Sequence, residues 1–523
     1  MTDGRTIVIG AGVGGLACAI DLAARGTHVR VLERAAAPGG KMRALPAGDA
    51  AVDAGPTVFT MRGVFDALFA DAGARLEDRL RLTPLEVLAR HAWDGSAHLD
   101  LFADRARSAD AIGRFAGAGA ARGYLEFCAR AKRVHDALDR DFMRASKPTP
   151  AGLVRRIGWR GARDMLAAPP FASLWSALGR DFADPRLRQL FGRYATYVGS
   201  SPFACPATLM LIAHVEQEGV WSVEGGMARV AQVLAALARE LGATIDCGAE
   251  VARIELGDGG ARGVVLADGT FLAADAIVCN ADAAALAGGR FGAAVAARTR
   301  ALAPARRSLS ARTWTLRGRG TGFAFVRHNV FFSRDYKAEF DAIFGRDEAP
   351  AEPTVYVCAQ DRADAAQAPD GGDERFLVLA NAPANGDRGD GGPAAMARAA
   401  QAATEVLKRC GAAIELDHPT ATATGPTGFE ALFPATGGAL YGQASHGWTA
   451  SFARPGTATP IPGLFLAGGS AHPGAGVPMA ALSGRLAAAA VRAHLVSIAP
   501  SRTTVTHGGT SMAGATTDAT GSS

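Results

Sequence analysis

The pattern of apolar and polar residues predicts two buried strands joined by a helix at the start of the chain. Residues 6–9 are a short apolar run, and residues 28–33 form a second run that ends in an acid, Glu33. Between these runs, small and apolar residues from about 13 to 25 favour a helix. A strand, a helix and a strand in this order are typical of a parallel sheet with its crossover helix.

Further elements are predicted along the rest of the chain. Residues 61–210 have a mostly helical pattern, and a strong helix is expected over 228–241. Alternation predicts a hairpin of residues 251–256 with 263–266. Other strands are predicted at 244–247, 276–279, 330–333, 354–358, 376–381 and 463–467, with a helix from about Val477.

Three glycines follow the first strand in G-x-G-x-x-G spacing. Gly10 permits a tight turn, Gly12 lets the backbone approach a pyrophosphate, and Gly15 allows close packing of helix on strand. The free N–H groups at the start of the helix favour phosphate oxygens. Glu33, at the end of the second strand, can accept hydrogen bonds from ribose hydroxyls. The sequence therefore predicts a bound dinucleotide.

A chance match is the alternative, because the chain holds 64 glycines in 523 residues. Gly117, Gly119 and Gly123 form another glycine cluster. A poor strand precedes that cluster and no strand ending in an acid follows it, so we assign the dinucleotide to the N-terminal match.

A second strand enters a glycine turn near the other end of the chain, at 463–469. A flavin dinucleotide needs one helix end for its pyrophosphate and another near its ribityl chain and ring. The sequence has no second complete fingerprint with its own strands. The pair of turns therefore favours FAD, and a separate nicotinamide site is not expected.

The overall composition excludes several classes of function. A net charge of +5 on 55 basic and 50 acidic residues gives no case for nucleic acid. The seven cysteines are scattered and form no C-x-x-C pair or Cys/His cluster, so neither a metal site nor a disulfide framework is indicated. Reduced thiols suit a cytoplasmic protein. The N-terminus does not read as a signal peptide, and no stretch reaches the roughly 20 apolar residues that span a bilayer.

Several sequence blocks resemble the carotenoid (phytoene-type) desaturases, which are FAD flavoproteins of the amine-oxidase type. The blocks are residues 8–15 with Glu33, 38–41, 53–57, 221–227, 331–340, 463–469 and 472–478, in the same order as in the family. Residues 381–387, 437–448 and 478–484 are most similar to the hydroxyneurosporene or 1-hydroxycarotenoid 3,4-desaturase branch.

The resemblance implies an α/β fold with α+β lobes. A Rossmann-like FAD-binding domain of the amine-oxidase and phytoene-desaturase type carries an inserted substrate lobe. The expected segments are 1–75, 216–285 and 456–497 for the FAD-binding parts, 76–215 for a mostly helical substrate- or membrane-facing segment, 286–455 for the substrate lobe, and 498–523 for a disordered tail.

The resemblance also implies which residues hold FAD. They are Gly10, Gly12, Gly14, Gly15, Glu33, Gly40, Lys41, Gly55, Pro56, Thr57, Val251, Gly468, Gly469, Val477 and Met479. Lys41 stands where these flavoproteins often carry Arg, and it would meet phosphate as a point charge. Ser470 and Ala471 follow the late turn where many flavoproteins have an acid, which puts a carboxylate contact to the ribityl chain in doubt.

The implied reaction removes two hydrogens from C3 and C4 of an acyclic C40 carotenoid with a terminal 1-hydroxy or 1-methoxy group. A hydride passes to the flavin and a proton leaves the neighbouring carbon. The allylic cation that develops is stabilised by the conjugated chain, so the protein's main task is to hold C3–C4 over the flavin in a dry tunnel.

His472, just past the late glycine turn, is the candidate catalytic residue, with a structural role bonded to the backbone as its alternative. His446 is a candidate for recognising the substrate hydroxyl or for loop packing. Arg327 and His328 are expected to be solvated turn residues. Residues 360–362 form either a polar tunnel rim or a salt-bridged strand end.

A substrate this apolar must enter the protein from lipid. We therefore expect peripheral contact with the cytoplasmic face of the inner membrane. Residues 155–160 and 167–178 combine Arg with Phe171, Leu174 and Trp175, which suits an interface. An amphipathic helix packed on the core is the alternative. The oligomeric state is not indicated.

Five other functions remain open. Within the family they are phytoene or neurosporene desaturation, carotenoid isomerisation and a ketolase-like oxidation. Beyond it stands an FAD amine oxidase, which needs an aromatic cage, whereas this chain has six Trp and six Tyr. A flavin-binding assembly factor would bind the cofactor without turnover.

Overall fold

A five-stranded parallel sheet organises one half of the molecule. The computed structural model describes residues 5–96, 98–156, 158, 171–362, 372–389 and 391–498. The strands run in the order β21 (Leu464–Leu466), β13 (Ala276–Cys279), β1 (Arg5–Ile9), β2 (His28–Glu33) and β9 (Thr244–Cys247), and all pairings are parallel. Ligands bind beyond the carboxyl ends of such strands, so both glycine turns lie at the same edge.

Two layers cover this sheet. On one face, Val8 and Val31 pack with helices α1 (Val13–Ala23), α9 (Met227–Glu240) and α16 (Val477–Ile498). On the other face, Ile7 and Ile277 pack with the antiparallel strands β10 (Val251–Gly257), β11 (Gly260–Leu266) and β12 (Phe271–Ala273). Both faces of the parallel strands are buried, which explains their continuous apolar runs.

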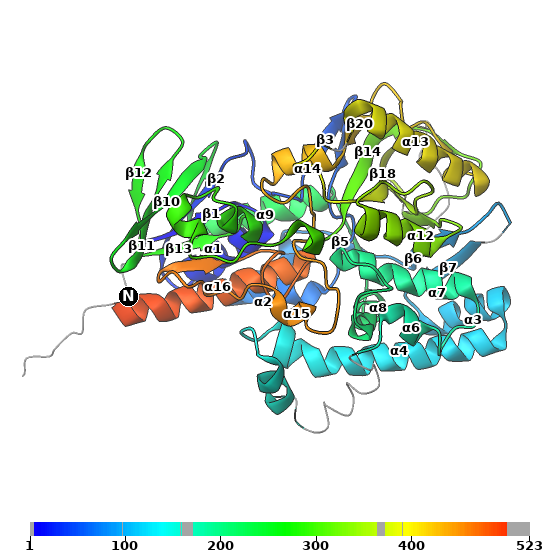
Figure 1. Cartoon of the computed structure of the whole chain (residues 1–523), viewed down its shortest axis with the longest axis horizontal. Helices are drawn as coiled ribbons and strands as arrows, with labels where there is room; N and C mark the ends of the chain where they lie inside the picture. Colours follow the sequence, from blue (N-terminus) through cyan, green and yellow to red (C-terminus); the bar gives the residue numbers. More distant parts are fainter. Residues whose placement is uncertain are drawn as a thin grey trace, which may run out of the picture.

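A seven-stranded mixed sheet forms the second half, seen at the upper right of Figure 1. Its order is β20 (Thr422–Thr424), β14 (Ser310–Gly318), β18 (Glu374–Ala382), β17 (Val355–Ala359), β16 (His328–Phe331), β6 (Val87–Ala92) and β7 (His98–Phe102). Neighbours are antiparallel except β16 and β6. Trp314, Val357 and Val378 pack on α13 (Gly392–Arg409), which covers one face.

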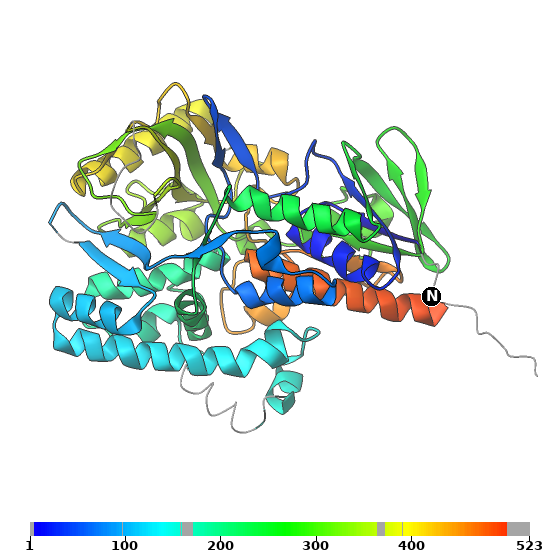
Figure 2. The ribbon, with the colours of Figure 1, turned by 180° about the vertical axis from the view of Figure 1, so that it is seen from behind.

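A group of helices, here called the helical arm, lies beside this sheet in both views (Figures 1 and 2). It contains α3 (Arg105–Ala116), α4 (Ala118–Leu138), α6 (Leu174–Leu178), α7 (Pro185–Gly192) and α8 (Leu211–Gln217). The arm is held by an aromatic core in which Phe191 contacts Tyr124, Phe127 and Phe182.

Shorter elements complete the described fold. They are β3 (Ala44–Ala47), β4 (Ala50–Asp53), α2 (Arg62–Asp71), η1 (Leu76–Asp78), β5 (Leu82–Pro84), η2 (Asp139–Met143), η3 (Arg193–Val198), η4 (Ala207–Met210), β8 (Trp221–Val223), α10 (Ala283–Ala287), α11 (Ala293–Ala296), η5 (Pro304–Arg306), β15 (Gly320–Thr321), α12 (Tyr336–Phe340), η6 (Asp341–Arg346), β19 (Ala413–Ile414), α14 (Pro426–Leu432) and α15 (Ala450–Ala453). Among the described helices, none joins the length and the apolar character that crossing a bilayer requires.

The sequence patterns find the first sheet better than the second. Strands β1, β2, β9, β13 and β21 coincide with predicted runs. Strand β14 has no counterpart in the prediction, and β6 and β7 come from a segment predicted as mostly helical. Strand β14 is buried along almost its whole length, although five of its nine residues are polar. The predicted tail begins at residue 498, which the structure places at the end of α16, and the rest of that tail lies outside the described residues.

Candidate active site

A cavity of about 1290 Å³ joins the two halves of the molecule. At its cofactor end, the glycine turns of the five-stranded sheet line it. At its sheet end, it is lined by one face of the seven-stranded sheet and by the helical arm. Small-molecule cavities usually measure about 300–1,000 Å³, so this one has room for a dinucleotide and a second, long ligand.

The two glycine turns touch each other at the cofactor end. Gly10 has φ +95°, in the left-handed region that favours glycine. A Cβ on Gly14 would lie 2.8 Å from the backbone nitrogen of Gly468 and 2.6 Å from Oδ1 of Asn280. Asn280, at the end of β13, donates from Nδ2 to the Gly10 carbonyl at 3.1 Å. Three distant segments therefore build one cradle of backbone, and sequence reasoning missed Asn280.

Glu33 is held in place at the end of β2. Its Oε2 accepts a hydrogen bond from the backbone N–H of Ala11 at 2.7 Å, and Oε1 accepts one from Ala35 at 2.9 Å. Helix α1 begins after Gly12 without a side-chain cap, so its first N–H groups are available to an anion. A fixed carboxylate, an uncapped helix start and a turn with glycine at positions 10, 12 and 14 together fit a dinucleotide.

A buried pair of cations lies beside the cradle. Lys41 donates from Nζ to the Leu440 carbonyl at 2.5 Å, and burial lowers its pKa while Asp282 partly restores it. Arg454 donates to the carbonyls of Tyr441 and Gly469 at 3.0 and 3.1 Å, and burial lowers its pKa to about 10. Asp282 caps α10 and lines the cavity, so an acid is present there although none follows the late glycine turn.

The structure places the other sequence-predicted cofactor residues around the same cavity. Gly12, Gly40, Gly55, Pro56, Thr57, Val251, Gly469, Val477 and Met479 line it, as do Gly10, Gly14, Glu33, Lys41 and Gly468. Gly15 is not among the lining residues. A Cβ on Gly15 would collide with the Gly10 carbonyl oxygen, which is the helix-on-strand packing expected of this position.

His472 is fully buried and lies behind the cavity lining. Its Nε2 lies 3.0 Å from the carbonyl oxygens of both Phe142 and Ala145, in η2 and just after it, and donates to them. Burial lowers its pKa. These bonds hold η2 against the late glycine turn. His446 likewise uses Nε2, here as acceptor from the Ser201 N–H at 2.9 Å, and its ring packs on Phe344.

The prediction that Arg327 and His328 are solvated turn residues is wrong. His328 begins β16, is only 3% exposed, and lines the cavity. Arg327 is buried and donates to the Gln360 carbonyl at 2.7 Å. Buried polar residues in a mixed sheet do not form an apolar run, so the sequence pattern cannot distinguish such a strand from a solvent-exposed turn.

Residues 360–362 form a bonded strand end, one of the two alternatives considered for them. Gln360 exchanges two hydrogen bonds with the backbone of Asp53, at 3.0 and 2.9 Å. Arg362 pairs with buried Glu374 at 2.5 Å, and Asp361 pairs with Arg375 at 2.5 Å. Gln360 connects this end of the seven-stranded sheet to the last residue of β4, while the two ion pairs tie the strand end to β18.

Opposite walls of the sheet end differ in polarity. Val330, Tyr356, Leu379 and Thr313 pair across four strands in one row and line the cavity, with His328 in the next row. The facing wall comes from the helical arm and its flanking segments and is mostly apolar. Its apolar lining residues are Leu138, Phe142, Met143, Leu153, Leu209, Leu211, Ile212 and Val215, and its polar ones are Arg193, Thr196, Tyr197, Thr208 and Glu216.

Exposed apolar side chains form the mouth of the cavity. Val154, Phe171 and Trp448 line it, although they are 58%, 78% and 46% exposed. The rings of Phe171 and Trp448 meet edge to face at 5.6 Å. Of the predicted membrane patch, Leu174 is buried and Trp175 packs on Phe203. Residues 157, 159, 160 and 167–170 of that patch lie outside the described residues.

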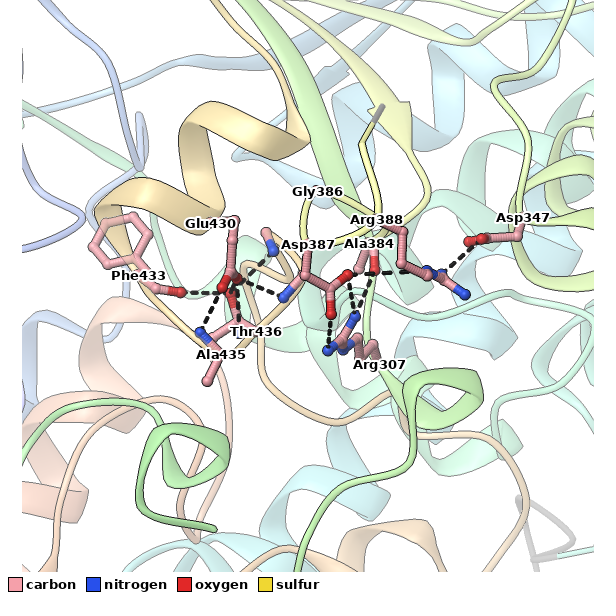
Figure 3. Close-up of polar contacts among 12 residues, drawn as sticks. Arg307, Asp347, Ala384, Gly386, Asp387, Arg388, Glu430, Phe433, Ala435 and Thr436 are labelled. Atoms are coloured by element: carbon pink, nitrogen blue, oxygen red, sulfur yellow. Dashed lines mark hydrogen bonds and ion pairs between the residues drawn. The ribbon is translucent and has the colours of Figure 1, made fainter. Parts of the chain in front are cut away.

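A polar network fixes the loops beside Phe433, which lines the cavity (Figure 3). Arg307 binds both carboxylate oxygens of Asp387, at 2.9 and 2.7 Å, and this holds the pKa of Asp387 below its usual value. Glu430 accepts three backbone N–H bonds, from residues 435–437, at 2.7, 2.9 and 2.7 Å. The network joins two stretches, 381–387 and 437–448, that carry the branch resemblance.

A group of possible metal ligands lies away from this cavity. His135, Asp136 and His214 place ligand atoms within 4.8 Å of one another between α4 and α8. The sequence did not predict this group, because His214 reaches His135 and Asp136 only through the packing of α8 on α4.

Comparisons with known proteins agree with this geometry. The model of the family described as flavin containing amine oxidoreductase matches residues 13–492. The chain belongs to this family. It is 51% identical to hydroxyneurosporene desaturase of Rubrivivax gelatinosus over 98% of each chain. It is 29% identical to 1-hydroxycarotenoid 3,4-desaturase of Flavobacterium sp., over 92% of this chain and 98% of the other.

The fold is shared with flavin amine oxidases. Wild-type putrescine oxidase bound to putrescine superposes with a TM-score of 0.58 at 15% identity, over 94% of this chain and 99% of the other. The family and the fold together make this protein an FAD-dependent oxidoreductase.

Proposed function

We propose that this protein is an FAD-dependent carotenoid desaturase that introduces a C3–C4 double bond into acyclic 1-hydroxy or 1-methoxy carotenoids. The observation that carries the proposal is the single cavity, which runs from a dinucleotide cradle to an apolar wall with a few polar groups opposite it. The 51% identity to a hydroxyneurosporene desaturase supports the substrate class.

Residues at the cofactor end would hold FAD. The uncapped start of α1 and the Gly10 to Gly14 turn suit the pyrophosphate, and Glu33 suits the ribose. Lys41, Asp282 and the backbone of Gly468 would border the ribityl chain and ring. When bound, FAD supplies an acceptor for the hydride that leaves the substrate.

The protein's own contribution to the reaction is to bind and orient the substrate and to exclude water from the cavity. The apolar wall of the helical arm removes water from a long hydrocarbon chain and aligns it along the cavity. Holding the reacting carbons in one orientation lowers the entropic cost of reaching the transition state. A small polar amine would leave this apolar surface without a matching partner, so a carotenoid suits the cavity better.

We also propose that the mouth of the cavity contacts a membrane. Val154, Phe171 and Trp448 place apolar surface where a lipid-soluble substrate enters, and Arg155 and Arg156 are exposed nearby. Such a combination suits the boundary between acyl chains and phosphates. We therefore propose that the protein lies peripherally on the cytoplasmic face of the inner membrane.

Co-expression tests the proposed function. Cells that make hydroxylated neurosporene or lycopene should gain a pigment with a longer chromophore and a red-shifted spectrum when this protein is added. Cells that make only phytoene are the control, because a new pigment in them would indicate phytoene desaturation instead. An unchanged pigment profile in the first strain, with the flavoprotein present, would contradict the proposal.

A further inference from the structure

Two buried histidines and two exposed carboxylates lie together where helix α8 packs on the end of helix α4. His135 and Asp136 belong to the last turn of α4, and His214 lies in α8. Ligand atoms of these three residues all lie within 4.8 Å of one another. Glu218, just after α8, adds Oε1 at 3.3 Å from Nε2 of His214. None of the four is among the described residues that line the cavity, so the proposed reaction does not use them.

The imidazole nitrogens of this group lack partners. Nδ1 and Nε2 of His135 and Nε2 of His214 are buried and form no hydrogen bond with any described residue. Leaving buried polar atoms unpaired is costly. The two rings meet edge to face with their centroids 4.8 Å apart, which keeps a nitrogen of each ring within reach of one shared ion. A bound cation would accept a lone pair from each ring.

The carboxylates open this group to water. The side chains of Asp136 and Glu218 are 54% and 53% exposed, whereas those of His135 and His214 are 9% and 10% exposed. Oδ1 of Asp136 lies 3.6 Å from Nδ1 of His135, so an oxygen on an exposed side chain lies beside a covered nitrogen. An ion can therefore bind first to the carboxylate and then move inward to the imidazoles.

The ligand set favours Zn²⁺ over the other common divalent cations. Imidazole nitrogen binds Zn²⁺ at about 2.0–2.1 Å and carboxylate oxygen at about 2.0–2.2 Å, so the ligand atoms of a tetrahedral site are separated by about 3.3 Å. Two pairs of atoms in this group are already separated by 3.6 and 3.3 Å. Mg²⁺ and Ca²⁺ prefer oxygen ligands, which would leave the histidines unused.

We propose that His135, Asp136 and His214 bind a divalent transition-metal ion, with Zn²⁺ as the expected metal and Glu218 or water in the fourth position. This inference does not rest on the proposed function. The ion would fasten the end of α4 to α8, two helices that also contribute to the cavity wall. Its role is therefore structural, because it holds this part of the helical arm together.

A lysine competes with the ion for one of the ligands. Lys132 donates from Nζ to both carboxylate oxygens of Asp136, at 3.1 and 2.8 Å. Both side chains are about half exposed, and exposed ion pairs contribute little to stability. Asp136 can therefore exchange this contact for a bound ion, and removal of the lysine charge should favour the ion.

The test titrates Zn²⁺ into the untagged flavoprotein after treatment with a chelator and desalting. Calorimetry, with competition against a zinc indicator, gives the number of sites and the Kd. We expect one site per chain with a Kd of about 1 µM. His135→Phe and His214→Phe keep a ring and remove its lone pairs, and each should weaken binding by about a hundredfold. His98→Phe, at an exposed histidine of β7, is the matched control and should keep the wild-type Kd.

Two further variants and two further measurements test the site if a buried histidine variant folds poorly. Asp136→Asn changes an exposed side chain and should weaken binding by about tenfold, while Lys132→Gln should tighten binding by about threefold. In the wild-type protein, Zn²⁺ should slow hydrogen exchange in peptides that cover 130–138 and 211–217. It should also raise the thermal midpoint by about 2–4 °C at a hundred times the Kd.

Three results would each overturn the inference. They are the absence of a saturable Zn²⁺ site in the wild-type protein, a wild-type Kd in both buried histidine variants, and exchange protection that is confined to other segments. None of them bears on the proposed function, because flavin content and carotenoid turnover are measured separately.

Discussion

The two ends of the cavity recognise their ligands by different means. The cofactor end is built from backbone, because its glycine turns leave no room for side chains between Gly14 and Gly468. The sheet end is built from side chains that project from alternate positions of neighbouring strands, such as Tyr356 and Leu379. A substitution at the cofactor end should therefore abolish ligand binding completely, whereas a substitution at the sheet end should weaken it gradually.

The largest effect is expected where the two turns meet. Gly14→Val places carbon atoms where the Gly468 backbone and Asn280 now lie, so the turns must separate and the cradle is lost. The purified variant should contain no flavin, as judged by its visible absorbance. Gly63→Val is the matched control, because a Cβ there meets nothing within 4 Å, and it should stay yellow. A yellow, fully loaded Gly14→Val protein would contradict the account of the cradle.

A smaller effect is expected at the buried cation. Lys41→Met removes positive charge beside the position expected for the flavin ring, and reduction of the flavin should slow by about a hundredfold. Because burial lowers the pKa of Lys41, its ammonium is lost as the pH rises through that lowered value, earlier than for a free lysine.

The pH profile separates charge from packing. Wild-type activity should fall on the alkaline side, and Lys41→Arg, which keeps its charge, should remove that fall. Identical alkaline profiles for the wild-type protein and Lys41→Met would mean that the ammonium has no part in the rate.

The smallest effect is expected at the mouth. Replacing both Phe171 and Trp448 with Ser removes exposed apolar surface and should weaken binding to vesicles of anionic lipid by about tenfold. Turnover of substrate delivered in detergent should change little. The same replacement at exposed Val496, far along α16, is the control for general loss of surface hydrophobicity. Equal vesicle binding by all three proteins would argue against the proposed entry from lipid.

The same contrast explains what the sequence reveals. Glycine spacing and an acid-ended strand encode a backbone site directly, so Gly10, Gly12 and Glu33 could be assigned before the structure was known. Strand β14 and residue His328 could not, because their polar side chains are buried by partners from distant strands. Asn280 and Asp282 follow a predicted strand, and only the parallel pairing of β13 with β1 shows that they reach the cavity.

The histidines show the limit of local context. His472 and His446 stand beside recognisable motifs, yet both use Nε2 on backbone groups. His328 stands in an unremarkable stretch and leaves Nε2 directed at no described partner. Which imidazole nitrogen lacks a hydrogen-bond partner depends on three-dimensional packing and cannot be predicted from the positions of histidines in the sequence.

The most direct test of the account mixes the purified protein, without oxygen, with an acyclic 1-hydroxycarotenoid that is saturated at C3–C4. We expect the bound flavin to lose its visible absorbance while the carotenoid spectrum shifts to longer wavelength by one added double bond. A flavin that stays oxidised, with the carotenoid recovered unchanged, would contradict the claim that both ligands meet in this cavity.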